Sequence, residues 1–114
     1  MADSAMREGA SVVTILWHAT PFRGDKFEDA WRPAAAAALD YGATYWAFLR
    51  SKDDPLDFTQ IAAFKDKKAF ERYWYSEEIS EARAEAHGFY EVPLLPVWFR
   101  VVGAGELAPE DVTA

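Results

Sequence analysis

Residues 43–74, ATYWAFLRSKDDPLDFTQIAAFKDKKAFERYW, decide the fold of this chain. Two runs rich in β-branched and aromatic residues, 43–51 and 56–64, stand on either side of the short polar segment KDDP, which is the pattern of an antiparallel β-hairpin. The second run leads through Asp66, a residue type that often caps helices, into a segment with aromatic residues on one helical side. The stretch therefore predicts a strand, a second strand and a helix.

The segments on either side of this stretch complete the order of elements. Before it, residues 11–19 (SVVTILWHA) have the composition of a strand, and apolar residues at helical spacing follow the turn TPFRG. We expect Asp25 to cap that helix, because Glu28 follows at the spacing of a capping box. Beyond the stretch, we expect Ser76 to start a further helical segment. A last strand is expected after Pro96, since proline cannot donate to a β-ladder.

This order of strand, helix, strand, strand, helix and strand predicts an α+β protein with a ferredoxin-like βαββαβ split fold. In that fold a four-stranded antiparallel sheet carries its helices on one face. The chain has 114 residues, which is room for one domain. We place the domain at residues 11–103, between a flexible N-terminal arm (1–10) and a C-terminal tail (104–114).

Two similar pentads, FEDAW (27–31) and FERYW (70–74), occur once in each half of the chain. Each lies near the start of a predicted helix, with its Phe and Trp one helical turn apart. We therefore expect both pairs to press on the sheet as core packing, with no part in catalysis.

Composition excludes several classes of function. The formal net charge of −7 argues against a nucleic-acid partner and against a basic membrane-binding patch. The chain has no cysteine, which excludes disulfides, thiolate metal sites and a cysteine nucleophile. No apolar run approaches the roughly 18 residues that a membrane helix needs. We expect a cytoplasmic protein with no nucleic-acid and no membrane partner.

Both faces of the predicted sheet are apolar. Side chains alternate between the two faces along a strand, and the first strand carries apolar residues on both (Val13, Ile15 and Trp17; Val12 and Leu16, with His18). Helices in this fold cover one face, so the other would expose more apolar surface than a monomer usually shows. Because a two-fold interface uses the same patch twice, we expect a homodimer through the sheet face. The alternative is that the tails or the segment VPLLP (92–96) cover it.

The chain also resembles a known family. Its order of elements, the segment RSKDDPLDFTQIAAFKDKKAFERYW (50–74) and the aromatic last strand are similar to the dimeric α+β barrel proteins, specifically the antibiotic biosynthesis monooxygenase-like ones. The resemblance covers about residues 11–103 and implies a cofactor-independent monooxygenase, with no flavin and no metal, acting on a hydrophobic phenolic or polyketide-like small molecule. The same superfamily holds cyclases, isomerases and proteins without known activity. The alternatives are therefore a non-catalytic small-molecule-binding dimer, or a cyclase or isomerase that uses the same pocket.

The resemblance further implies an apolar pocket between the helices and the sheet of each subunit. The residues expected to bind substrate there are aromatic: Trp17, Trp31, Trp46, Phe48, Tyr73, Trp74 and Trp98. For each of them the alternative is ordinary core packing. Five polar side chains are available to orient a phenol: Tyr45, Tyr73, Tyr75, Gln60 and Arg50.

Removing a proton from the substrate needs a base, and the candidate catalytic residues are the two histidines, His18 and His87. His18 ends the first strand, where a structural role is equally open. His87 precedes Gly88 at a helix end, where the helix dipole favours an imidazolium without any catalytic role.

Metal and haem sites have little support in the sequence. Haem-degrading relatives use a helix histidine as iron ligand together with an asparagine and a tryptophan. This chain has no asparagine, and the resemblance puts Ala82 or Arg83 where that histidine is expected. Two isolated histidines also do not form a three-ligand zinc site. We predict no cofactor and no metal.

Overall fold

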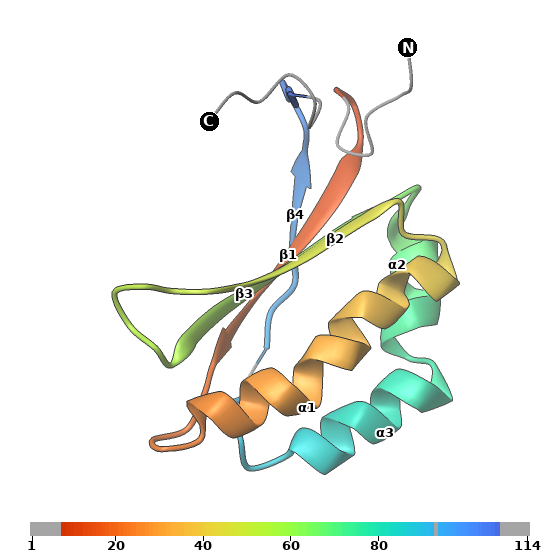
Figure 1. Ribbon diagram of the computed structural model, residues 1–114. Coiled ribbons are helices and arrows are strands. Elements are labelled where there is room, and N and C mark those ends of the chain that lie inside the picture. Colours follow the sequence, from red (N-terminus) through yellow and green to blue (C-terminus); the bar gives the residue numbers. More distant parts are fainter. Residues whose placement is uncertain (1–7, 93, 108–114) are drawn as a thin grey trace.

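The computed structural model describes residues 8–92 and 94–107, and its elements follow the predicted order (Figure 1). The elements are β1 (Ser11–His18), α1 (Gly24–Ala36), the 3₁₀ helix η1 (Ala37–Tyr41), β2 (Tyr45–Arg50), β3 (Asp57–Phe64), α2 (Lys67–Trp74), α3 (Glu77–Ala86) and β4 (Val97–Arg100). Residues 1–7 and 108–114, which form most of the predicted arm and tail, lie outside the described residues.

The four strands form one antiparallel sheet in the order β2-β3-β1-β4. All three α-helices lie on one side of it (Figure 1). This arrangement confirms the α+β class and the ferredoxin-like topology. β1 and β3 are therefore the central strands, and β2 and β4 are the edge strands.

The hydrophobic core lies between the helices and the sheet. On the central strands the helix-facing side chains are buried, and they are Val13, Ile15, Trp17, Phe58, Gln60, Ala62 and Phe64. Both pentads pack against them. The rings of Phe27 and Trp31 stack with centroids 6.4 Å apart, and those of Phe70 and Trp74 stack at 5.7 Å. The prediction that the pentads form core is therefore confirmed.

The helix starts show which capping predictions were right. Asp66 accepts a hydrogen bond from the backbone N–H of Ala69 at the start of α2, and Ser76 accepts one from the N–H of Ile79 at the start of α3. The prediction for Asp25 was wrong. α1 begins at Gly24, two residues before the start that a cap at Asp25 implies, and its N-cap residue Arg23 makes no side-chain capping hydrogen bond.

The physical reason is a long-range ion pair. Asp25 Oδ1 accepts a hydrogen bond from Arg50 Nη1 at 2.8 Å. The Asp25 carboxylate, in the first turn of α1, therefore pairs with the Arg50 guanidinium from β2. The spacing of residues within α1 does not predict this contact.

The other side of the sheet carries no helix, and we call it the open face. Its side chains include Val12, Leu16, Tyr45, Ala47, Leu49, Ile61, Val97 and Phe99. Leu16 is 64% exposed, Phe99 56% and Leu49 50%. The homodimer expected through this face stays a prediction, as does the cytoplasmic location. Within the described parts of the chain, no helix is long and apolar enough to cross a membrane.

Candidate functional site

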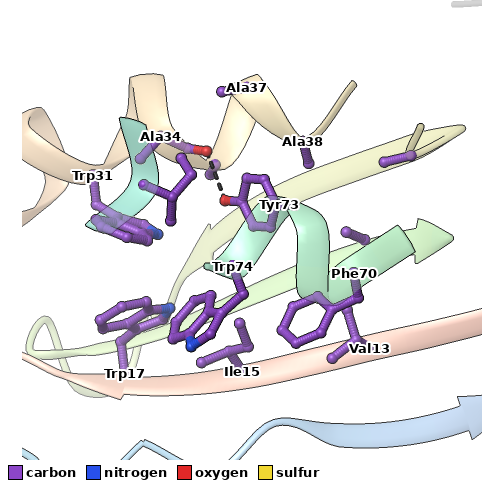
Figure 2. Close-up of a cluster of buried hydrophobic side chains, with 14 of the residues drawn as sticks. Val13, Ile15, Trp17, Trp31, Ala34, Ala37, Ala38, Phe70, Tyr73 and Trp74 are labelled. Carbon is purple, nitrogen blue, oxygen red and sulfur yellow. Dashed lines mark hydrogen bonds between the residues drawn. The ribbon is translucent and has the colours of Figure 1, made fainter. Parts of the chain in front are cut away.

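The space between the helices and the sheet is filled by aromatic side chains (Figure 2). Trp17 from β1, Trp31 from α1 and Tyr73 from α2 are buried at the centre. The rings of Trp17 and Trp31 lie 4.6 Å apart, and that of Trp74 lies 6.1 Å from Trp17. These side chains pack against each other where the sequence predicted a cavity.

A buried hydrogen-bond network, the Gln60 network, holds this centre together. Gln60 Oε1 accepts the indole N–H groups of both Trp17 (3.1 Å) and Trp31 (2.8 Å). Gln60 Nε2 donates to the hydroxyl of Tyr73 (2.9 Å), which in turn donates to the backbone carbonyl of Ala34 (2.6 Å; Figure 2). Burial raises the pKa of Tyr73, so its hydroxyl stays neutral and remains a donor. Each buried polar side-chain atom of this network has a hydrogen-bond partner, so the network fixes the interior.

A pocket opens instead at the outer edge of the sheet, beside α1. We call it the edge pocket. It has a volume of about 250 Å3 and is lined by Glu28, Arg32, Trp46, Phe48, Arg50 and Phe58. The edge strand β2 supplies three of these side chains at alternate positions, because residues two apart point to the same face of a strand.

Arg50 is held firmly at this pocket. Its Nη1 donates to Asp25 Oδ1 (2.8 Å) and Glu28 Oε1 (2.9 Å), and its Nε donates to the carbonyl of Pro55 (2.7 Å). The guanidinium also lies 5.0 Å from the centroid of the Phe58 ring. Hydrogen bonding to Asp25 raises the pKa of Arg50, so the guanidinium stays charged.

Glycine at position 24 makes room for this arrangement. A Cβ atom there would lie 2.5 Å from Arg50 Nη2 and 3.0 Å from the carbonyl oxygen of Pro55. Both distances are shorter than ordinary contacts, so a side chain at the first residue of α1 would force the Arg50 guanidinium and the Pro55 carbonyl to shift.

Glu28 sits between the two arginines. Its Oε1 accepts from Arg50, and its Oε2 accepts from Arg32 Nη2 at 2.6 Å. Both carboxylate oxygens are therefore already hydrogen-bonded, and Glu28 can take a substrate proton only by loosening an ion pair. The arginines remain as the groups that can pair with an anionic oxygen near three aromatic rings.

The structure separates the seven side chains predicted to bind substrate. Trp46 and Phe48 line the edge pocket. Trp17, Trp31, Tyr73 and Trp74 are buried in the core, and Trp98 is half-buried against Phe70, with centroids 5.5 Å apart. Substrate binding by any of the seven stays a prediction.

The two histidines lie apart from the edge pocket. His18 points to the open face, where its Nδ1 lies 2.5 Å from Asp57 Oδ1. This hydrogen bond raises the pKa of His18. His87 is the exposed C-cap residue of α3, followed by Gly88 at a φ of 97°. Their catalytic roles stay predictions.

One group of side chains in the described residues has the composition to hold a metal ion. Ligand atoms of His18, Asp54 and Asp57 lie within 4.8 Å of one another. The His18–Asp57 ion pair accounts for the closeness of those two residues, and Asp54 Oδ1 accepts a hydrogen bond from the backbone N–H of Leu56.

Three residues of the edge pocket had no place among the predicted site residues: Glu28, Arg32 and Phe58. The Glu28–Arg32 pair has i, i+4 spacing, a signal that could have placed both on one helix face. The sequence does not predict that Glu28 contacts Arg50, because this contact depends on the packing of α1 beside β2.

The fold and the pocket define a small α+β domain of ferredoxin-like topology with an aromatic, arginine-bearing pocket beside its edge strand. No family model matches the sequence, and no curated protein matches it either. Solved structures do match.

The chain is similar to a candidate antibiotic biosynthesis monooxygenase from Nitrosomonas europaea, with a TM-score of 0.73 and 18% identity over 82% of this chain and 91% of the other. It is also similar to SnoaB, a cofactor-independent oxygenase from Streptomyces nogalater, with a TM-score of 0.67 and 17% identity over 89% and 98% of the two chains. A protein of unknown function from Bacteroides thetaiotaomicron, described as a possible oxidoreductase, has a TM-score of 0.69 and 10% identity over 82% and 98%. The chain therefore has the antibiotic biosynthesis monooxygenase-like fold, which confirms the predicted resemblance at the level of fold.

Proposed function

We propose that the protein is a cofactor-independent monooxygenase that oxidises a hydrophobic phenolic or polyketide-like small molecule in the edge pocket. The observation that carries this proposal is the combination of three aromatic rings with two arginines around one cavity. Its volume of about 250 Å3 suits a compound of one or two rings, being slightly below the roughly 300–1,000 Å3 common for ligand pockets. The oxygenases among the structural neighbours support the class of reaction.

The arginines supply the electrostatics that such a reaction needs. A guanidinium beside a phenolic oxygen favours the phenolate and so lowers the pKa of the bound phenol. Arg32 is the more available of the two, because Glu28 is its one ion-pair partner among the described residues. Arg50 is fixed by three acceptors and holds the position of Glu28. In this proposal Arg32 pairs with the substrate oxygen and the proton leaves to water.

The substrate itself supplies the electrons. A phenolate conjugated to a ring-activated CH2 group loses a proton from that carbon and transfers one electron to O2, giving a substrate radical and superoxide. Their combination forms a C–O bond, and protonation gives a hydroperoxide. Loss of the second C–H proton and cleavage of the O–O bond release water and leave a carbonyl group. The carbon gives up four electrons and O2 accepts four, so no other reductant is needed.

A non-catalytic small-molecule-binding protein is the second candidate. It is favoured by the positions of His18 and His87, since neither lines the edge pocket. Binding of the phenol without oxygen uptake would support this candidate over the first.

Oxygen uptake with a model phenol that carries a ring-activated CH2 group, such as 6-hydroxy-2-tetralone, tests the first proposal. We expect protein-dependent uptake that Arg32→Gln reduces at least about tenfold, in line with the loss of one charge-assisted contact. The matched control is Arg72→Gln, which removes an exposed arginine from α2 and should leave the rate unchanged. His18→Ala and His87→Ala should leave the rate of oxygen uptake unchanged, because neither histidine lines the edge pocket. A slower rate in either variant would support that histidine as the base. No uptake by the wild-type protein with any phenol that it binds would exclude the oxygenase.

We also propose that a second copy of the chain covers the open face. The support is the set of exposed apolar side chains on three of the four strands, β1, β2 and β4, which includes Leu16, Leu49 and Phe99. Sheet-to-sheet packing of two copies would remove them from water at one two-fold interface. Sedimentation equilibrium at micromolar concentration should give twice the chain mass of 12.9 kDa. A stable single chain would contradict this.

A further inference from the structure

A second arginine site lies away from the edge pocket, where α2 meets α3. Arg83, on α3, stacks on the ring of Trp74, with its guanidinium carbon 4.3 Å from the ring centroid. Its Nη1 donates to the backbone carbonyl of Trp74 at 2.6 Å, and its Nη2 makes a long contact of 3.4 Å with Ser80 Oγ. The guanidinium is therefore held in one orientation.

Arg83 differs from the other half-buried arginine, Arg50, in its counter-charge. Of the arginines in the described parts of the chain, two are not exposed, Arg50 and Arg83. Arg50 pairs with Asp25 and Glu28. For Arg83 no carboxylate partner occurs among the described residues, although the chain carries 19 acidic residues against 12 basic ones.

A purely structural role, stabilising the C-terminal end of α2, explains part of the position of Arg83. The Trp74 carbonyl lies at the C-terminal end of α2, and a cation is favourable there. That carbonyl accepts one N–H, whereas a guanidinium has five. The titratable groups whose charge acts on Arg83 are the hydroxyls of Tyr73, Tyr75 and Tyr90. Burial without a counter-charge also lowers the pKa of Arg83, which is the mark of an incompletely compensated cation.

We propose that the Arg83–Trp74 pair is a binding site for the carboxylate of a small aromatic acid. A planar carboxylate can take two parallel N–H groups from the free edge of the guanidinium. An aromatic ring on the same ligand would then lie near Tyr75, which is 70% exposed, and Trp74, which remains 9% exposed. This site stands on its own residues and does not depend on the edge pocket or on the proposed oxygenase activity.

The five indole N–H groups of the chain provide the test, because each gives its own signal in a proton–nitrogen NMR spectrum. Trp74 reports on the Arg83 site, and Trp46 reports on the edge pocket. Titration with benzoate should shift the Trp74 indole and the Arg83 Nε–H signals in a saturable way. We expect a Kd on the order of 1–10 mM, as suits one bidentate contact. Benzamide, which has the same shape without the charge, should not shift them.

Variants sharpen this result. Arg83→Gln should weaken benzoate binding at least about tenfold, and Arg83→Lys several-fold, since lysine keeps the charge and loses the fork. Arg72→Gln, on the surface of α2, is the matched control and should bind as the wild type does. If Arg83→Gln does not fold, the comparison of benzoate with benzamide on the wild-type protein still decides the question. Shifts confined to Trp46, equal shifts with benzamide, or unchanged affinity in a folded Arg83→Gln variant would each overturn the proposal.

Discussion

Replacing Gln60 by leucine tests how the interior of this fold is held together. The change keeps the size of the side chain and removes the acceptor shared by two buried indole N–H groups, those of Trp17 and Trp31. A buried donor without a partner costs about 1–3 kcal/mol. Two of them cost about 2–6 kcal/mol, and the apolar leucine offsets about 1–2 kcal/mol of this by burial. Taking the central values of the two ranges, we expect Gln60→Leu to lower the free energy of unfolding by about 2–3 kcal/mol.

Equilibrium urea unfolding at one fixed protein concentration measures this change. With a slope of about 1–3 kcal/mol per molar urea for a small domain, a loss of about 3 kcal/mol moves the midpoint by about 1–3 M. The matched control is Glu71→Gln, an exposed position on α2 that should leave the midpoint almost unchanged.

A double-mutant cycle isolates the cause. In a Trp31→Phe background one of the two donors no longer exists, so Gln60→Leu should cost about 1–3 kcal/mol less than it does in the wild type. Additive effects in the cycle, or a Gln60→Leu variant as stable as the wild type, would refute the reasoning that hydrogen bonding holds the interior closed.

Three further predictions use the same structure. His18→Gln should lower stability by less than about 1 kcal/mol, because the ion pair with Asp57 is exposed. The folded pKa of His18 is raised above 6.5, so the loss should be full below pH 6.5 and vanish as the pH rises past the folded pKa. Urea unfolding at pH 5.5 and pH 8 would measure this difference. Phe99→Asp should weaken the proposed homodimer at least about 30-fold in sedimentation, and an unchanged association constant would remove this strand from the interface. Gly24→Ala should cost about 1–3 kcal/mol in thermal or urea unfolding, because its Cβ displaces Arg50, and a neutral effect would contradict the tight approach described above.

The sequence predicted those features of the fold that depend on local signals. The caps at Asp66 and Ser76 and the start of the last strand after Pro96 all depend on neighbouring residues, and all three are found. The cap at Asp25 failed because its carboxylate has a partner 25 positions away, Arg50. A pattern of spacing within one segment carries no information on such a contact.

The site was less predictable, for a related reason. Alternation along the strands separates the two faces of the sheet, and Trp17, Trp46 and Phe48 share the helix-facing one in the structure. It does not say that Trp17 lies on a central strand and the other two on an edge strand. Strand order decides which aromatic side chains are sealed in the core and which line a pocket, and strand order follows from the packing of the whole chain.

Alternation along β2 also bears on whether the two proposals for this protein are compatible. Tyr45, Ala47 and Leu49 point to the open face, where a second copy would pack. Trp46 and Arg50 point to the opposite face and line the edge pocket. Because neighbouring residues of one strand serve the two surfaces separately, pairing of two copies through the open face leaves the pocket residues of both copies uncovered. Phe99→Asp should therefore separate the copies without changing the affinity of the edge pocket for a phenol. A parallel loss of both properties would mean that the partner copy contributes to the pocket.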